Sequence, residues 1–216
     1  MMMSLPFFSH DKGWYPALPH CQGNPFGARL LQIEPDHLMA RNAAMWDGMD
    51  ADVVQALTDD PLEIRFQAER HLLLVYQEGV RKDGETFVDG KRRSAVRALK
   101  RKLTFVPVNS EFCERQRPRI KSRIICFYFD SGKMPALGVR PVHFGSRVLF
   151  ESNPVWESAV KVAAAMEEGP EAERYAEALG VVIGYELLRN SENFELHGLP
   201  AKGGLAACTG EPLRTM

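Results

Sequence analysis

Residues 123–130 read Arg-Ile-Ile-Cys-Phe-Tyr-Phe-Asp, the longest β-rich run in the chain. Such a concentration of β-branched and aromatic residues is typical of a strand. A second stretch, residues 71–77, is apolar almost throughout and predicts a strand that is covered on both faces. Because successive side chains of a strand point to opposite faces, at most one of Phe127 and Tyr128 faces the interior of the sheet.

Shorter strand patterns surround these two runs. Residues 62–66 alternate apolar with polar side chains, and residues 103–106 form a short apolar run that ends at Pro107. Asp-Gly pairs at 83–84 and 89–90 predict hairpin turns, and residues 139–150 predict a further hairpin that turns at Gly145-Ser146. Strands with turns about every ten residues favour a small barrel or sandwich.

Helical spacing of apolar residues precedes and follows the strands. Residues 35–49, with Asp36 near the N-cap, predict one helix, and residues 52–57 predict a short second one. After Pro154, residues 156–166 and 171–190 predict an antiparallel helix pair, separated by Gly169-Pro170. The first 32 residues are rich in proline, glycine and aromatic residues and predict an irregular arm.

Charge is balanced over the whole chain but not along it. The 216 residues are 45% apolar and 25% charged, with a formal net charge of -1, as in ordinary globular proteins. Residues 91–123 nevertheless hold twelve Lys or Arg against two acids, between two acidic stretches. This pattern indicates an exposed basic face or internal charge pairing. A nucleic-acid surface is the less favoured interpretation, because aromatic residues rarely interrupt the bases.

Cysteine usage and the N-terminal sequence bear on the compartment. Four cysteines stand at positions 21, 113, 126 and 208, without a C-x-x-C pair or the spacing of a zinc site. This spacing is typical of reduced thiols in an intracellular protein. The sequence shows no signal-peptide pattern and no apolar run long enough to span a bilayer. We therefore expect a cytoplasmic protein that has no contact with a membrane.

Catalytic patterns are missing from the sequence. The six histidines form no H-x-H pair, so we expect no metal ion and no other cofactor. Neither a G-x-S-x-G nor a phosphate-binding glycine pattern occurs, and no histidine adjoins Cys113 or Cys126. The expectation is thus that the protein has no catalytic residues and is not an enzyme.

Several motifs in a fixed order resemble the N-terminal domain of transcriptional regulators of the AraC/XylS type. They are Arg-Lys-Asp-Gly-Glu-Thr at 81–86, Val-Asp-Gly at 88–90, Lys-Leu-Thr-Phe-Val-Pro at 102–107 and Phe-Tyr-Phe-Asp at 127–130. The resemblance covers roughly residues 34–205 and includes Tyr-Ala-Glu-Ala-Leu at 175–179 and Gly-Gly-Leu-Ala at 203–206. It implies a cupin-like β-barrel that senses a small-molecule effector, followed by a helix pair that mediates dimerisation.

The resemblance also implies an α+β fold with four parts. These are an N-terminal arm with helices (1–58), a cupin-like β-barrel (59–153), a C-terminal antiparallel helix pair for dimerisation (154–196) and a linker remnant with a tail (197–216). In the family, two helix-turn-helix units follow, whereas this chain ends ten residues after Ala206. We therefore expect a truncated regulator with no direct DNA binding of its own. The alternative is a stand-alone cupin-fold enzyme that acts on a small molecule.

Two sets of residues are candidates for function. The first would line the barrel mouth and bind the effector, with an arginine orienting it: Tyr76, Arg81, Phe105, Arg123 and Tyr128. The second would form the contact of a homodimer along one helix: Tyr175, Leu179, Val182, Ile183 and Leu187. For each aromatic residue singly, core packing is the more common role.

Overall fold

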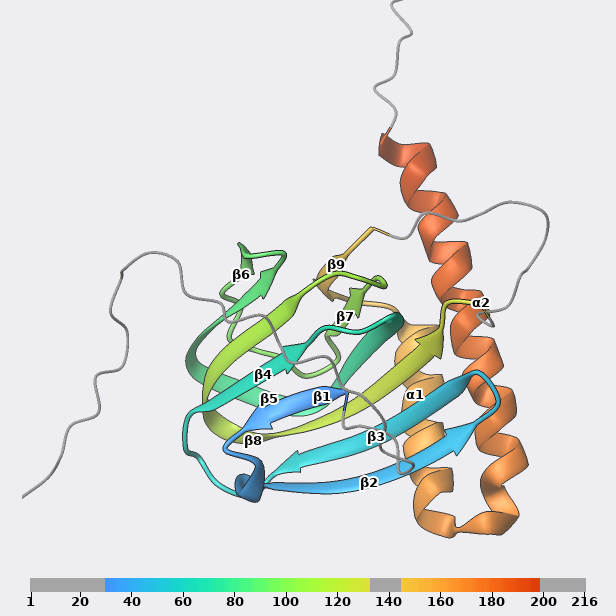
Figure 1. Cartoon of the computed structure of the whole chain (residues 1–216), viewed down its shortest axis with the longest axis horizontal. Coiled ribbons are helices and arrows are strands. Elements are labelled where there is room, and N and C mark those ends of the chain that lie inside the picture. Colours follow the sequence, from blue (N-terminus) through green and yellow to red (C-terminus); the bar gives the residue numbers. More distant parts are fainter. Residues whose placement is uncertain (1–29, 133–144, 199–216) are drawn as a thin grey trace, which may run out of the picture.

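A strongly bent antiparallel sheet with two helices on its outer face makes up the structure (Figure 1). The computed structural model describes residues 30–132 and 145–198. The strands are β1 (Leu31–Glu34), β2 (Met39–Trp46), β3 (Met49–Ala56), β4 (Leu62–Phe66), β5 (Arg70–Val88), β6 (Lys91–Ser94), β7 (Leu103–Val106), β8 (Phe112–Asp130) and β9 (Arg147–Phe150). The helices are α1 (Asn153–Glu168) and α2 (Glu173–Gly198), with short 3₁₀ turns at Asp36–Leu38 and Pro170–Ala172.

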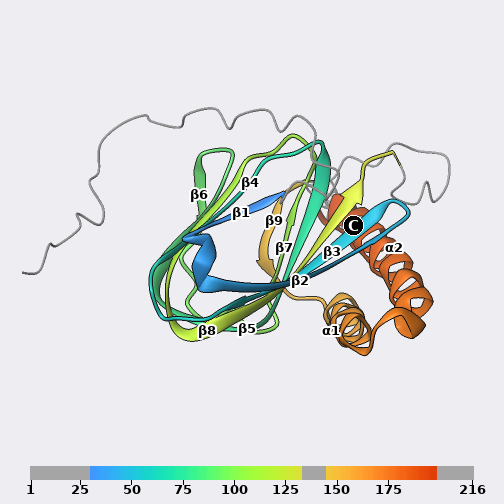
Figure 2. The ribbon, with the colours of Figure 1, turned by 60° about the horizontal axis from the view of Figure 1, so that its bottom comes forward.

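Two long strands form the centre of the sheet. β5 and β8 each have 19 residues and pair with one another over most of their length. Their register shifts repeatedly between Tyr76 and Asp83, where β-bulges bend both strands. The bend folds the sheet over itself, so that β1, β4 and β6 lie on one half and β3, β7 and β9 on the other (Figure 2).

The two faces of the bent sheet bury different cores. Inside the bend, residues such as Ile64, Tyr76 and Tyr128 pack between the two halves. On the outer face, residues such as Val75 and Phe127 pack against α1 and α2. Both sides of the central strands are therefore covered, which explains why their sequences are apolar without alternation.

Several predictions from the sequence are confirmed. Strands occur at 62–66 and 103–106, and the two central runs lie within β5 and β8. The turn at Asp89-Gly90 connects β5 to β6, with both residues at positive φ. The two C-terminal helices are present as well, and they pack against each other.

The helices predicted at 35–49 and 52–57 are wrong. These residues form the hairpin β2–β3, which turns at Asp47-Gly48. β2 lies at the edge of the sheet and is largely exposed, so its apolar residues do not alternate and happen to follow a helical spacing. β3 is buried on both faces, which removes the alternation there also.

Two further expectations need correction. Asp83-Gly84 is not a hairpin turn but part of the bend within β5, where Gly84 has φ +150°. The sheet is also not a closed barrel, because β1 and β9 end the described strand order without pairing with each other. The arm at 1–29 and the tail at 199–216 lie outside the described residues, as does the first half of the hairpin predicted at 139–150.

Candidate functional site

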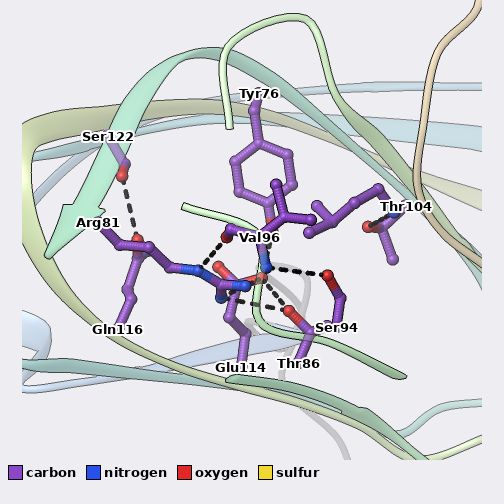
Figure 3. A network of polar contacts seen from close by, with 10 residues as sticks. Tyr76, Arg81, Thr86, Ser94, Val96, Thr104, Glu114, Gln116 and Ser122 are labelled. Atoms are coloured by element: carbon purple, nitrogen blue, oxygen red, sulfur yellow. Dashed lines mark hydrogen bonds and ion pairs between the residues drawn. The ribbon is translucent and has the colours of Figure 1, made fainter. Parts of the chain in front are cut away.

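A polar network inside the bend is the first candidate site (Figure 3). It joins Tyr76 and Arg81 of β5 to Glu114 of β8, all of them buried. The Tyr76 hydroxyl donates a hydrogen bond to Glu114 Oε2 at 2.8 Å, and the Thr86 hydroxyl donates to the same oxygen at 3.1 Å. Arg81 Nη1 lies 3.8 Å from that oxygen, and both side chains of this ion pair are 0% exposed.

The bend positions the arginine. Arg81 Nε donates to the backbone oxygen of Val96 at 2.6 Å, and Nη1 donates to the Thr86 hydroxyl at 3.3 Å. Because the register shifts on both sides of Arg81, its side chain turns inward, while Lys82 beside it is exposed. The guanidinium thereby ties Thr86 and Glu114, which lie on one half of the sheet, to the loop that contains Val96.

Burial controls the electrostatics of the network. Burial raises the pKa of Glu114 above its usual value, and the nearby Arg81 guanidinium opposes this rise. The pKa of Tyr76 is also raised, first by burial and then by the adjacent Glu114 carboxylate. The ion pair is therefore held in a region from which water is excluded, where removal of either charge is costly.

Some polar atoms of this region have no hydrogen-bond partner among the described residues. They are Arg81 Nη2, Glu114 Oε1 and Gln116 Nε2, all inaccessible to solvent. Gln116 accepts a hydrogen bond from the Ser122 hydroxyl at 3.3 Å through its other amide atom. Two donors and one acceptor thus remain available to bound water or to a polar ligand.

The structure separates the residues predicted to bind an effector. Tyr76 and Arg81 meet through Glu114, as described above. Tyr128 also faces the interior but stacks on Phe66, with 6.2 Å between ring centroids. Phe105 lies on the outer face against the helices, and Arg123 is half-buried at the outer side, where it bonds Gln77 and pairs with Glu167. The predicted set therefore does not form one site.

Glu114 and Gln116 were missed by the sequence reasoning. Both lie on β8 among charged residues that point outward, such as Arg115 and Arg117, so the stretch resembles an exposed segment. Glu114 and Gln116 differ from the outward-pointing residues only in which side of the strand they face. The register of β8, which decides this, cannot be derived from the sequence alone.

The outward face of α2 is the second candidate site. Its inward face packs Ile183 and Leu187 into the core, and Leu179 adjoins that core. Tyr175 and Val182 point away from the sheet together with Val181 and Tyr185, which the sequence reasoning did not include, and these four side chains are 45–53% exposed. The predicted dimer residues are thus divided between an internal contact and an exposed apolar face, which we call the α2 face: Tyr175, Val181, Val182 and Tyr185.

Neither a metal-binding cluster nor a membrane-spanning helix occurs among the described residues. Within residues 30–132 and 145–198, no group of three or more His, Cys, Asp or Glu side chains has the arrangement to hold a metal ion. Among the helices described, none combines the length and apolar character that a membrane span requires.

Comparison with known proteins gives weak likenesses only. No protein-family model matches the chain, and no curated protein does. Among solved structures, the cupin domain of Cnp3 from Schizosaccharomyces pombe is 12% identical and covers 48% of this chain and 72% of its own, with a TM-score of 0.34. A Cupin 2 conserved barrel domain protein from Salinispora arenicola is 11% identical (47% and 83% covered, TM-score 0.33). KdgF from Halomonas sp. is 16% identical (45% and 84% covered, TM-score 0.33).

Proposed function

We propose that the chain is an effector-sensing and dimerisation module of an AraC-like transcriptional regulator and that it has no catalytic activity. The observation that carries this proposal is the α2 face, because α2 has two apolar faces and the described residues of the chain cover only one of them. Four large apolar side chains on one exposed helix face form the kind of patch that marks an interface. The sequence motifs shared with AraC-type regulators support the same assignment.

A second copy of this chain is the partner that fits the α2 face. In an antiparallel contact with the two-fold axis at Val181, Tyr185 faces Glu177 of the second copy, and Arg189 faces its Glu173. The apolar centre is then flanked by opposite charges on both sides of the axis. Full burial of an exposed side chain such as valine contributes about 1.5–3 kcal/mol. The side chains of the α2 face are half-exposed, so each would contribute about half of that range, and two-fold symmetry doubles each contribution.

Sedimentation velocity over a concentration series tests the contact. We expect a dimer for the unmodified protein and a monomer for Val181→Lys and Val182→Lys, because each places two uncompensated charges near the axis. Ala164→Lys is the matched control, since Ala164 is an exposed position of α1 outside the α2 face. A protein that is monomeric at every concentration, or lysine variants that dimerise like the control, would contradict the proposal.

Effector sensing rests on the interior network. Arg81, Glu114 and Gln116 each offer an unmatched polar atom between the two halves of the sheet, where a small polar molecule would stabilise one arrangement of the bend. A panel of sugars, amino acids and carboxylic acids can be screened for a rise in Tm. We expect the rise in Tm that an effector causes to disappear in Gln116→Leu. An equal rise in Tm in that variant would place the effector-binding site elsewhere.

A further inference from the structure

Three chain segments lie side by side at the bend of the sheet. The backbone N–H of Arg81 donates to the carbonyl of Arg97 at 3.0 Å, and Val80 forms a bridge with Ala98. On the other side, Arg81 pairs with Pro118 of β8. Residues that are far apart in the basic stretch of the sequence are thus brought to one surface, which lies at the end of the sheet away from α2 (Figure 2).

Basic side chains dominate this surface. Along β8, Gln116, Pro118 and Ser122 are buried, whereas the alternate residues Arg117, Arg119 and Lys121 point outward. Lys82 and Arg97 are exposed on the two neighbouring segments. We call these five residues the basic bend surface: Lys82, Arg97, Arg117, Arg119 and Lys121. Two exposed acids, Glu78 and Asp83, adjoin it, so positive charge predominates.

Some neighbouring bases are paired with acids, whereas most bases of the bend are not. Arg65 and Arg115 contact Glu63 within 3.3 Å, and elsewhere Arg92 contacts Glu85 at 2.9 Å. In the described part of the chain, by contrast, no residue forms an ion pair with Lys82, Arg97, Arg119 or Lys121. Internal charge pairing therefore does not account for this part of the basic stretch.

We propose that the basic bend surface contacts the phosphate backbone of a nucleic-acid duplex without reading its sequence. At about 3.3 Å per residue, Arg117 and Lys121 are separated by roughly 13 Å along β8. One strand of a duplex presents one phosphate per about 3.4 Å of helix axis, so three regularly spaced bases reach phosphates of a single strand. This contact goes beyond the sensing and dimerisation proposed above. It also departs from the expectation of no direct DNA binding, although it involves no recognition of sequence.

The composition of the surface favours a duplex over other anionic partners. The five residues include no aromatic side chain on which an unpaired base could stack, as proteins that bind single strands require. Ile120, which is 49% exposed, is an isolated apolar side chain beside them, too little to insert into a bilayer. Neither of the two described α-helices belongs to this surface, so the contact that we propose includes no base readout.

Fluorescence anisotropy with a mixed-sequence duplex of about 25 base pairs tests the proposal over a series of salt concentrations. For the unmodified protein we expect micromolar to submillimolar binding that is independent of sequence and weakens with salt. In Arg119→Gln/Lys121→Gln, the slope of log K against log [salt] should become shallower by about 1.8, or about 0.9 for each lost phosphate contact. Lys161→Gln/Arg174→Gln, which removes two exposed bases from the helices, should keep the slope of the unmodified protein.

Several results would overturn the proposal. They are an equal loss of slope in the helix control, no binding at low salt, and competition by polyglutamate or anionic phospholipid vesicles that equals competition by unlabelled duplex. The Tm of both double variants should match that of the unmodified protein, because all four residues are exposed. If the first double variant does not fold, Lys82→Gln/Arg97→Gln replaces it with the same expected change of slope.

Discussion

Arg81→Met is expected to be among the most destabilising single substitutions in this fold. The change removes the hydrogen bond to the Val96 carbonyl and leaves the Glu114 carboxylate without its cation in a fully buried position. A hydrogen bond from a charged donor contributes about 1.5–3 kcal/mol, and breaking a buried ion pair on one side costs about 3–5 kcal/mol. Because the two effects overlap, we expect the free energy of unfolding to fall by about 3–5 kcal/mol at pH 7.

The pH dependence gives this prediction a second signature. Without Arg81, the pKa of Glu114 rises further above its unfolded-state value, because the cation that opposed the effect of burial is gone. At a pH between the unfolded-state and the folded-state pKa of Glu114, the folded protein binds more protons than the unfolded protein. The free energy of unfolding therefore falls as the pH rises through this range. The difference in the free energy of unfolding between Arg81→Met and the unmodified protein should therefore shrink as the pH is lowered from 7 to 5.

Urea unfolding followed by circular dichroism provides the measurement. Arg81→Met/Glu114→Gln should recover about 2 kcal/mol relative to Arg81→Met alone, because neither buried charge remains and the glutamine oxygen still accepts hydrogen bonds. Arg93→Met is the control, since Arg93 is an exposed arginine of β6, and its effect should stay within about 0.5 kcal/mol. A loss below about 1 kcal/mol for Arg81→Met, or a deficit that does not change with pH, would refute the reasoning.

Four other outcomes are expected. Gly84→Ala should lower stability by about 1–3 kcal/mol and more than Gly90→Ala. The new Cβ at position 84 would lie 2.9 Å from both the Gln116 Cα and the Arg81 side chain, whereas no atom of the described residues lies within 4 Å of a Cβ at position 90. Equal losses in urea unfolding would contradict this prediction. Cys113 and Cys126 are both buried, and burial raises the pKa of Cys113 to about 12. Iodoacetamide at pH 8 should therefore alkylate neither thiol in folded Cys21→Ser/Cys208→Ser protein. Rapid modification, detected by mass spectrometry, would show that these thiols are accessible. Metal analysis should find no stoichiometric transition metal, and one equivalent of metal would favour the alternative of a cupin-fold enzyme. Gel-shift assays should find no sequence-selective DNA binding.

The sequence predicted the parts of the fold that have a regular pattern. Residues 62–66 alternate because one face of β4 is buried, and the spacing within α1 reflects a helix that lies on a sheet. The hairpin β2–β3 was mistaken for helices because one of its strands is an exposed edge and the other is buried on both faces. The Asp47-Gly48 turn was the local signal that could have corrected this.

The candidate sites depend on long-range geometry, so only fragments of them could be predicted from the sequence. Tyr76 and Arg81 were selected, but Glu114, which joins them, is 38 residues from Tyr76 and becomes its neighbour only through the register of β5 with β8. On α2, the helical spacing identified apolar residues correctly but could not show that Ile183 and Leu187 face the sheet while Val181 and Tyr185 face away from it.

A covalent link across the proposed two-fold axis tests the account most directly. In Cys21→Ser/Cys208→Ser protein, Val181→Cys places one thiol of each copy at the axis, where the helices approach closely enough for a disulfide. Mild oxidation at micromolar concentration should convert most of this variant into a covalent dimer, while the same protein with Ala164→Cys instead stays monomeric on a non-reducing gel. Equal cross-linking at both positions, or none at position 181, would contradict self-association through the α2 face.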